Sequence, residues 1–102
     1  MPKKINKARV RDARNHAIRR AKERYGLDLG IHDLERISAL IRDGCAMLVD
    51  KQSHTREFYV VRHQGEYLPV VYGAKIRTLH TFLPQEVLTE KVLEGIDKFP
   101  HW

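Results

Sequence analysis

The chain has 102 residues, 42% of them hydrophobic, and a net charge of +6. Its length fits one domain, and its longest apolar runs are far too short to cross a bilayer, so we expect no membrane association. No apolar stretch follows the basic N-terminus, so we expect no secretory signal. A single cysteine cannot form an internal disulfide, which favours a cytoplasmic location.

Most of the positive charge lies in residues 1–24. This segment holds ten of the 19 Lys and Arg residues and two of the 13 acidic residues, so its net charge is +8 and the remainder carries −2. A basic face on an otherwise near-neutral domain is typical of a protein that binds phosphates. The alternative is a solvated helix face with a loose basic tail.

Residues 1–6 carry charges without an apolar pattern, so we predict a disordered basic tail. From Lys7 to Tyr25, apolar residues recur at spacings of three and four, which predicts an amphipathic helix that stops at Gly26. A second helix, with its apolar set within residues 34–41, is expected to begin at a cap formed by residue 32 or 33.

The pattern then changes to that of strands. β-forming residues and turn signals predict four antiparallel strands at residues 46–50, 56–63, 66–72 and 76–83. Pro84 suits the first turn of a last helix, whose apolar set reaches Ile96. The order predicts an α+β fold in residues 7–98: N-terminal helices packed on a four-stranded antiparallel sheet, with a C-terminal helix.

Three side chains on the first helix could carry chemistry. His16, Arg20 and Arg24 are spaced four apart, so they form one row along the border of the apolar stripe. This position suits a site where the helix meets the sheet. Equally, these side chains could lie flat over the edge of the core.

The last strand offers two alternative sets of polar side chains. Strict alternation places Arg77 with Thr81 on one face, and Thr78 with His80 on the other. Both faces carry two large apolar residues, so the pattern leaves open which face meets the helices.

Further basic residues are candidates for contacts with nucleic acid. The polar loop at residues 51–56 holds groups of the kinds that bind phosphates, although a polar loop needs no function. The candidate contacts are Lys7, Arg11, Arg14, Arg24, Lys51, Arg56 and Lys75. No HExxH, CxxC, P-loop or GxGxxG motif is present, so we expect no metal and no cofactor.

Three strings carry a resemblance to a known superfamily: HAIRRAKERYGL from His16, EYLPVVY from Glu66 and IRTLHTFLP from Ile76. Together with the short helix that ends at Gly44, they resemble the barnase–EndoU–colicin–RelE endoribonucleases, near the RelE-type and BrnT-type toxins. The resemblance covers about residues 12–84. It implies a metal-independent ribonuclease fold, with active groups on the first helix and on the sheet.

Carried over to this chain, the resemblance implies His16, Arg20 and Arg24 on the first helix and Thr81 on the last strand, and it extends less closely to Arg77 and Tyr72. The predicted catalytic residues are His16, Arg20, Arg77 and Thr81. The resemblance implies an endoribonuclease or toxin-like protein whose partners are RNA or the ribosome, and a protein antitoxin or host protein. The alternative function is a non-catalytic regulator, phage-encoded or bacterial, that binds RNA, the ribosome or a host protein. A third possible function is that of a structural module that binds an acidic protein. The sequence is also compatible with a homodimer.

Overall fold

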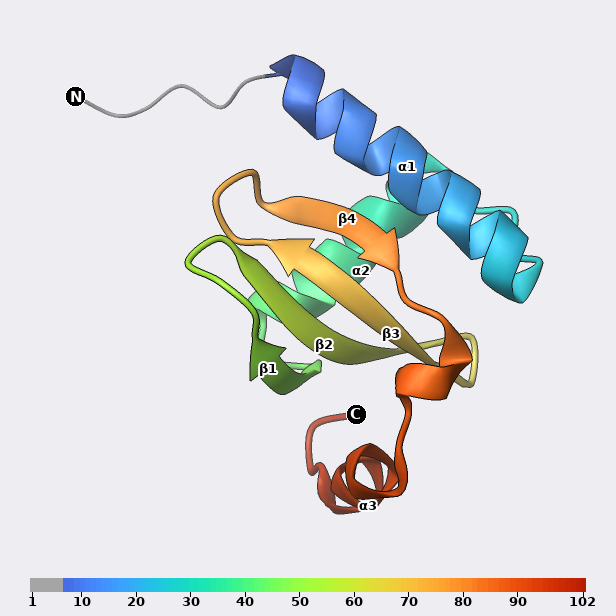
Figure 1. Cartoon of the computed structure of the whole chain (residues 1–102), viewed down its shortest axis with the longest axis vertical. Helices are drawn as coiled ribbons and strands as arrows, with labels where there is room; N and C mark the ends of the chain where they lie inside the picture. The colour runs from blue at the N-terminus through green and yellow to red at the C-terminus, as the bar shows by residue number, and fades with distance from the viewer. Residues whose placement is uncertain (1–6) are drawn as a thin grey trace.

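The computed structural model describes residues 7–102. Two helices precede a four-stranded antiparallel sheet, and a third helix follows it (Figure 1). The elements are α1 Lys7–Tyr25, α2 Ile31–Arg42, β1 Met47–Lys51, β2 Arg56–His63, β3 Glu66–Gly73, β4 Thr78–Phe82, the 3₁₀ turn η1 Gln85–Val87 and α3 Glu90–Lys98. The predicted α+β fold is confirmed, whereas the predicted disordered tail at residues 1–6 lies outside the described part.

Helix α1 has the bounds that its apolar spacing predicts. Its buried stripe consists of Ala13, Ala17 and Ala21, each four residues apart. Their small side chains let the helix axis approach β4 closely, and α1 runs alongside that strand (Figure 1). Gly26 ends the helix with a φ of +65°, a left-handed conformation that favours glycine.

Helix α2 begins earlier than its apolar pattern predicts. The residue that caps it is Gly30, not His32 or Asp33. Asp33 contributes from the third helical position, where its Oδ2 accepts a hydrogen bond of 2.8 Å from the Gly30 N–H. The prediction failed because an acidic residue can stabilise a helix N-terminus from inside the first turn as well as from the cap.

The strands follow the chain in the order β1-β2-β3-β4. Strands β2 and β3 form a regular hairpin, paired from Arg56 with Gly73 to His63 with Glu66. Gln64 and Gly65 connect them with φ values of 51° and 81°. Two consecutive left-handed residues match the twist of the hairpin, which confirms the predicted tight turn.

Strand β4 departs from the predicted alternation. It begins at Thr78 instead of residue 76, because the Arg77 N–H closes a turn onto the Gly73 carbonyl at 2.7 Å. Thr81 pairs with β3 and so does Leu79, but His80 between them has no partner in the register. This β-bulge shifts the alternation by one residue, so the prediction that Arg77 and Thr81 share one face of the strand is wrong.

The two faces of the sheet bury different segments. Leu34 and Ile37 of α2 pack with Leu79 and Phe82 of β4 in the larger core cluster, on the side of α1. On the other face, Ile96 of α3 packs against β2. Among residues 7–102, no helix combines the length and the apolar character needed to cross a membrane.

The last helix starts later than the sequence predicts. Pro84 precedes only the single 3₁₀ turn η1, and α3 begins after Thr89, whose Oγ1 accepts a hydrogen bond from the Val92 N–H at 3.4 Å. Leu88 is partly buried in the cluster that holds α3 to the sheet. The apolar spacing that predicts one helix from Pro84 is therefore divided between two elements.

Candidate active site

A hollow of about 300 Å³ lies beside the bulge of β4. Its lining residues come from α1, from the turn before β2, and from β2, β3, β4 and the segment after it: His16, Gln52, Arg56, Val71, His80, Thr81 and Leu83. We call this the His16–His80 hollow. It brings together two of the predicted catalytic residues, His16 and Thr81, and adds a second histidine.

The bulge explains how His80 and Thr81 reach the same hollow. In a regular strand, neighbouring side chains point to opposite faces of the sheet. The extra residue in β4 breaks that alternation, and both side chains line one hollow. The His80 ring also lies close to β3: a Cβ atom added to Gly73 would be 2.6 Å from its Nε2. Gly73 therefore makes room for the imidazole.

We expect Gly73→Ala to displace the His80 ring and to destabilise the fold by about 1–3 kcal/mol, because the new methyl group overlaps the ring and the Cγ1 of Ile76 at 2.8 Å. The free energy of unfolding in urea and the NMR signals of the His80 ring test this expectation. The matched control is the same substitution in a His80→Ala protein, where the loss should be smaller. An equal loss in both backgrounds would show that Gly73 does not position His80.

The electrostatic surroundings keep both histidines neutral to a lower pH than usual. Burial, followed by the charges of Arg20, Arg19 and Arg24, lowers the pKa of His16 below its ordinary value of 6.5. Burial also lowers the pKa of His80, with further contributions from Arg56, Arg9 and protonated His16. The unfolded chain therefore binds these protons more tightly. Both groups contribute stability above pH 6.5, and that stability is lost as the pH falls through their folded pKa values.

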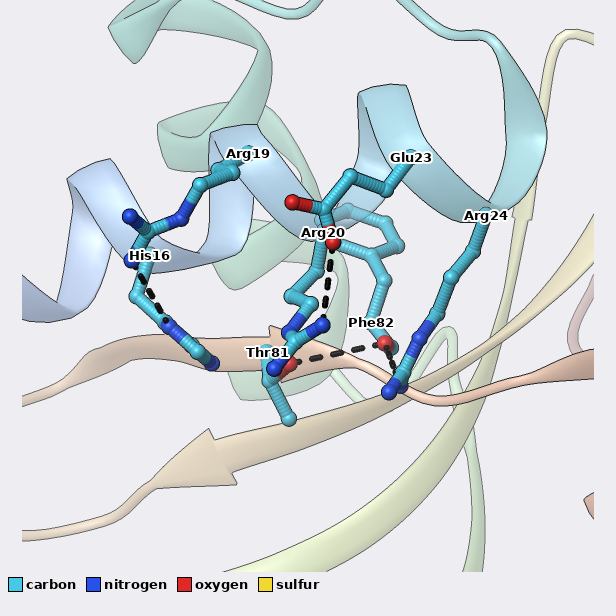
Figure 2. A network of polar contacts seen from close by, with 7 residues as sticks. All are labelled: His16, Arg19, Arg20, Glu23, Arg24, Thr81 and Phe82. Atoms are coloured by element: carbon cyan, nitrogen blue, oxygen red, sulfur yellow. Dashed lines mark hydrogen bonds and ion pairs between the residues drawn. The ribbon is translucent and has the colours of Figure 1, made fainter.

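The predicted row on α1 does face β4. Figure 2 shows the side chains of His16, Arg20 and Arg24 pointing from the helix toward the strand. Arg24 donates a hydrogen bond of 2.7 Å to the carbonyl oxygen of Phe82, which ties α1 to the end of β4. Arg24 thus has a structural contact, and it lines a different hollow, next to Tyr25 and η1.

Arg20 and Arg19 act on His16 in different ways. Arg19 Nη2 donates to Nδ1 of His16 at 3.4 Å, a contact that requires this nitrogen to be unprotonated. Arg20 Nη1 donates to Oε2 of Glu23 at 2.9 Å, in an exposed ion pair of small energetic value. Arg20 does not line the His16–His80 hollow, but its charge lowers the pKa of His16 from beside it.

The structure does not bring Arg77 to the other predicted catalytic residues. Arg77 lies in the turn before β4 and lines a separate hollow together with Arg14. Strict alternation along the strand predicts that Arg77 and Thr81 lie on one face. The turn at Arg77 and the bulge at His80 both break this alternation. Arg77 is therefore not a neighbour of His16 in this fold.

The remaining predicted contacts are distributed over the surface. Arg56 lines the His16–His80 hollow and also a smaller adjoining one, which Lys75 and His80 share. Lys51 is exposed on β1, and Lys7 and Arg11 are exposed on α1. Only Arg56 among the seven predicted nucleic-acid contacts lies within the His16–His80 hollow.

Two polar lining residues, His80 and Gln52, are not among the site residues that the sequence predicts. Strict alternation offers His80 only in the alternative set with Thr78, on the face opposite Thr81. The bulge that joins His80 and Thr81 contains neither glycine nor proline, the residues that usually mark such irregularities. Gln52 comes from the polar turn before β2, where its backbone N–H donates to the Arg56 carbonyl at 3.0 Å.

Two imidazoles, a guanidinium and a hydroxyl in one hollow can transfer protons and hold an anion. Within residues 7–102, no three His, Cys, Asp or Glu side chains gather as a group able to hold a metal ion. No family model, curated protein or solved structure matches the chain. The resemblance to the endoribonuclease superfamily therefore stays a prediction.

Proposed function

We propose that this protein binds RNA and cleaves it without a metal ion in the His16–His80 hollow. The observation that carries the proposal is that histidines from two different elements line one hollow with Arg56 and Thr81. The high positive charge of α1 next to this hollow supports a polyanionic substrate. The chemistry of the hollow agrees with the activity that the sequence resemblance implies. The residues that line it include His16 and Thr81 but not Arg20 or Arg77, which the resemblance also implies.

RNA carries its own nucleophile, so the residues present are sufficient for its cleavage. The 2′-oxygen attacks the adjacent phosphorus, the bond from phosphorus to the 5′-oxygen breaks, and a 2′,3′-cyclic phosphate forms. One group must accept the 2′-hydroxyl proton and another must give a proton to the leaving 5′-oxygen. In this hollow, His16 and His80 fill those two roles.

The charges around the two histidines suit one of them to act as a base and the other as an acid. Protonation of His16 disfavours protonation of His80, so the pair passes through a state with one charged and one neutral ring. That state holds a base and an acid at the same time. Arg56 holds a phosphate oxygen through its guanidinium. The Thr81 hydroxyl, which donates to the Phe82 carbonyl oxygen at 3.4 Å in the structure, turns to donate to another phosphate oxygen. Arg20 adds positive charge from the flank.

The test is cleavage of a mixed pool of labelled single-stranded RNA in the presence of EDTA. We expect fragments that end in 2′,3′-cyclic phosphate, and no cleavage of DNA of the same sequence, because DNA lacks the 2′-hydroxyl. Fragments with a 5′-phosphate, or cleavage that stops in EDTA, would contradict the proposed mechanism. Slowed growth of cells on expression would further support a toxin-like role.

The charge of α1 also supports a second function, a non-catalytic regulator that binds RNA, the ribosome or a host protein. Lys7 and Arg11 are exposed and lie outside the His16–His80 hollow. If RNA binds but stays uncut, the logarithm of the binding constant should fall with the logarithm of salt concentration by about 0.7 per phosphate neutralised. A weak salt dependence would favour a protein partner instead.

A further inference from the structure

A second hollow, of about 350 Å³, lies between α1, α2 and the turn that precedes β4. Its lining residues are Arg14, Glu35, Ser38, Arg42 and Arg77. We call it the Arg77 hollow. None of these residues lines the His16–His80 hollow, so this site is defined independently of the proposed cleavage. Three guanidinium groups and one carboxylate leave a local excess of two positive charges.

Ser38 has a hydroxyl group that the described residues do not satisfy. The residue is 2% exposed, lies on α2 and lines the Arg77 hollow, yet its Oγ has no hydrogen-bond partner in residues 7–102. A buried hydroxyl without a partner is unfavourable, and buried polar groups in proteins are nearly always paired. An acceptor bound in the hollow would provide the missing partner.

The backbone of Arg77 gives a second indication. Arg77 has a φ of +57°, the left-handed region that glycine adopts easily and a large side chain adopts at a cost. Its N–H closes the turn to Gly73, and its carbonyl oxygen accepts a hydrogen bond of 3.4 Å from Arg42 Nη1. The turn would form more easily with glycine at this position, whereas arginine supplies a guanidinium to the hollow.

Arg14 and Arg42, the other two arginines of the hollow, also contact neighbouring residues. Arg14 Nε donates to Thr78 Oγ1 at 3.4 Å, and its Nη2 lies 3.7 Å from Glu35 Oε1. This ion pair neutralises one charge in the hollow. Arg42 and Arg77 have no ion-pair partner among the salt bridges of the described residues.

From these contacts we propose that the Arg77 hollow binds a phosphate group. Guanidinium forks bind phosphate oxygens through paired hydrogen bonds, and the excess of two positive charges favours an anion, whether a phosphodiester monoanion or a free phosphate ion. The Ser38 hydroxyl donates the additional hydrogen bond. The phosphate comes either from a free phosphate ion or from the backbone of a bound RNA, and the same contacts hold it in both cases.

The experiment is a titration of the full chain with two probes, inorganic phosphate and a short single-stranded RNA without terminal phosphates. Binding is followed by the NMR signals of the Arg Nε–Hε groups and by isothermal calorimetry. We expect both Arg42→Gln and Ser38→Ala to weaken binding of the probe that carries the natural phosphate. Arg42→Gln should weaken it by about tenfold or more, because it removes a charge-assisted hydrogen bond. The matched control is Arg36→Gln, which removes the same charge from an exposed position of α2 outside the hollow.

Arg77→Gly separates binding from folding. Glycine fits the left-handed turn, so the variant should keep or raise its thermal midpoint while its affinity falls by about tenfold. Loss of phosphate binding alone identifies a free phosphate as the source, and loss of RNA binding identifies a backbone phosphate. The proposal is overturned if neither probe shifts the arginine signals of the hollow, or if Arg36→Gln weakens binding as much as Arg42→Gln. The RNA titrations are made in a His80→Ala background, so that none of these outcomes depends on cleavage of the RNA.

Discussion

His80→Ala is expected to lower the rate of metal-free RNA cleavage by about 10²–10⁴-fold, the usual contribution of a positioned acid or base. His16→Ala is expected to have an effect of similar size, because each histidine supplies one of two proton transfers in the proposed mechanism. Arg20→Ala should cost less, since Arg20 acts on His16 through its charge from outside the hollow. The measurement is kcat/KM on a labelled RNA in EDTA.

The matched control is His32→Ala, which removes an exposed imidazole from α2, outside the hollow. This variant should cleave at the wild-type rate. A double His16→Ala, His80→Ala variant should be little slower than either single variant, because groups that act as a unit are not additive. If His80→Ala retained the full rate, the assignment of an acid–base pair to this hollow would be wrong.

The pH dependence of cleavage tests the same pair by another route. Because the pKa values of His16 and His80 both lie below 6.5, we expect the pH optimum of kcat/KM below 6.5. Burial is the largest cause at His80, and Arg56 is the next. Arg56→Gln should therefore raise the pKa of His80 and move the profile toward higher pH. Arg62→Gln, an exposed change on the same strand, should leave the profile in place.

Phe82→Ala is expected to destabilise the protein by about 3–5 kcal/mol, the usual cost of removing a large aromatic side chain from a packed core. Phe82 is 0% exposed and lies among side chains of α1, α2 and the sheet. A domain of this size has about 5–15 kcal/mol of total stability, so the substitution should remove a substantial share of it. Unfolding in urea, followed by circular dichroism, measures the loss.

Leu93→Ala provides the control for Phe82→Ala. Leu93 is 48% exposed on α3, so its truncation should change the free energy of unfolding by less than about 0.5 kcal/mol. Because the carbonyl of Phe82 also anchors Arg24, a shift of β4 in the variant would loosen α1 as well. A loss below about 1 kcal/mol would mean that the packing around β4 is looser than the burial of Phe82 indicates.

Local sequence signals determined several elements of this protein correctly. Apolar residues at spacings of three and four between Val10 and Tyr25, followed by Gly26, were sufficient for the bounds of α1, because both the stripe and the stop are local properties. The hairpin of β2 and β3 followed from β-forming residues around Gln64 and Gly65. The same helical spacing placed His16 on the side of α1 that faces β4.

The first residues of α2 and α3 depended on cap contacts that the apolar spacing of the sequence does not specify. Gly30 caps α2 because Asp33 reaches back to its N–H, and Thr89 caps α3 after η1 has turned the chain. In each case, two signals competed within four or five residues.

The composition of the candidate site was decided by the tertiary structure. A bulge between paired strands placed His80 beside Thr81, and a turn moved Arg77 to a hollow formed with α1 and α2. Register and turn geometry depend on how β3 and β4 pair while Leu79 and Phe82 both enter the core. The sequence by itself thus determined which residues carry charge and on which elements, and the pairing of the strands decided which of them meet, because burial of the core sets the register.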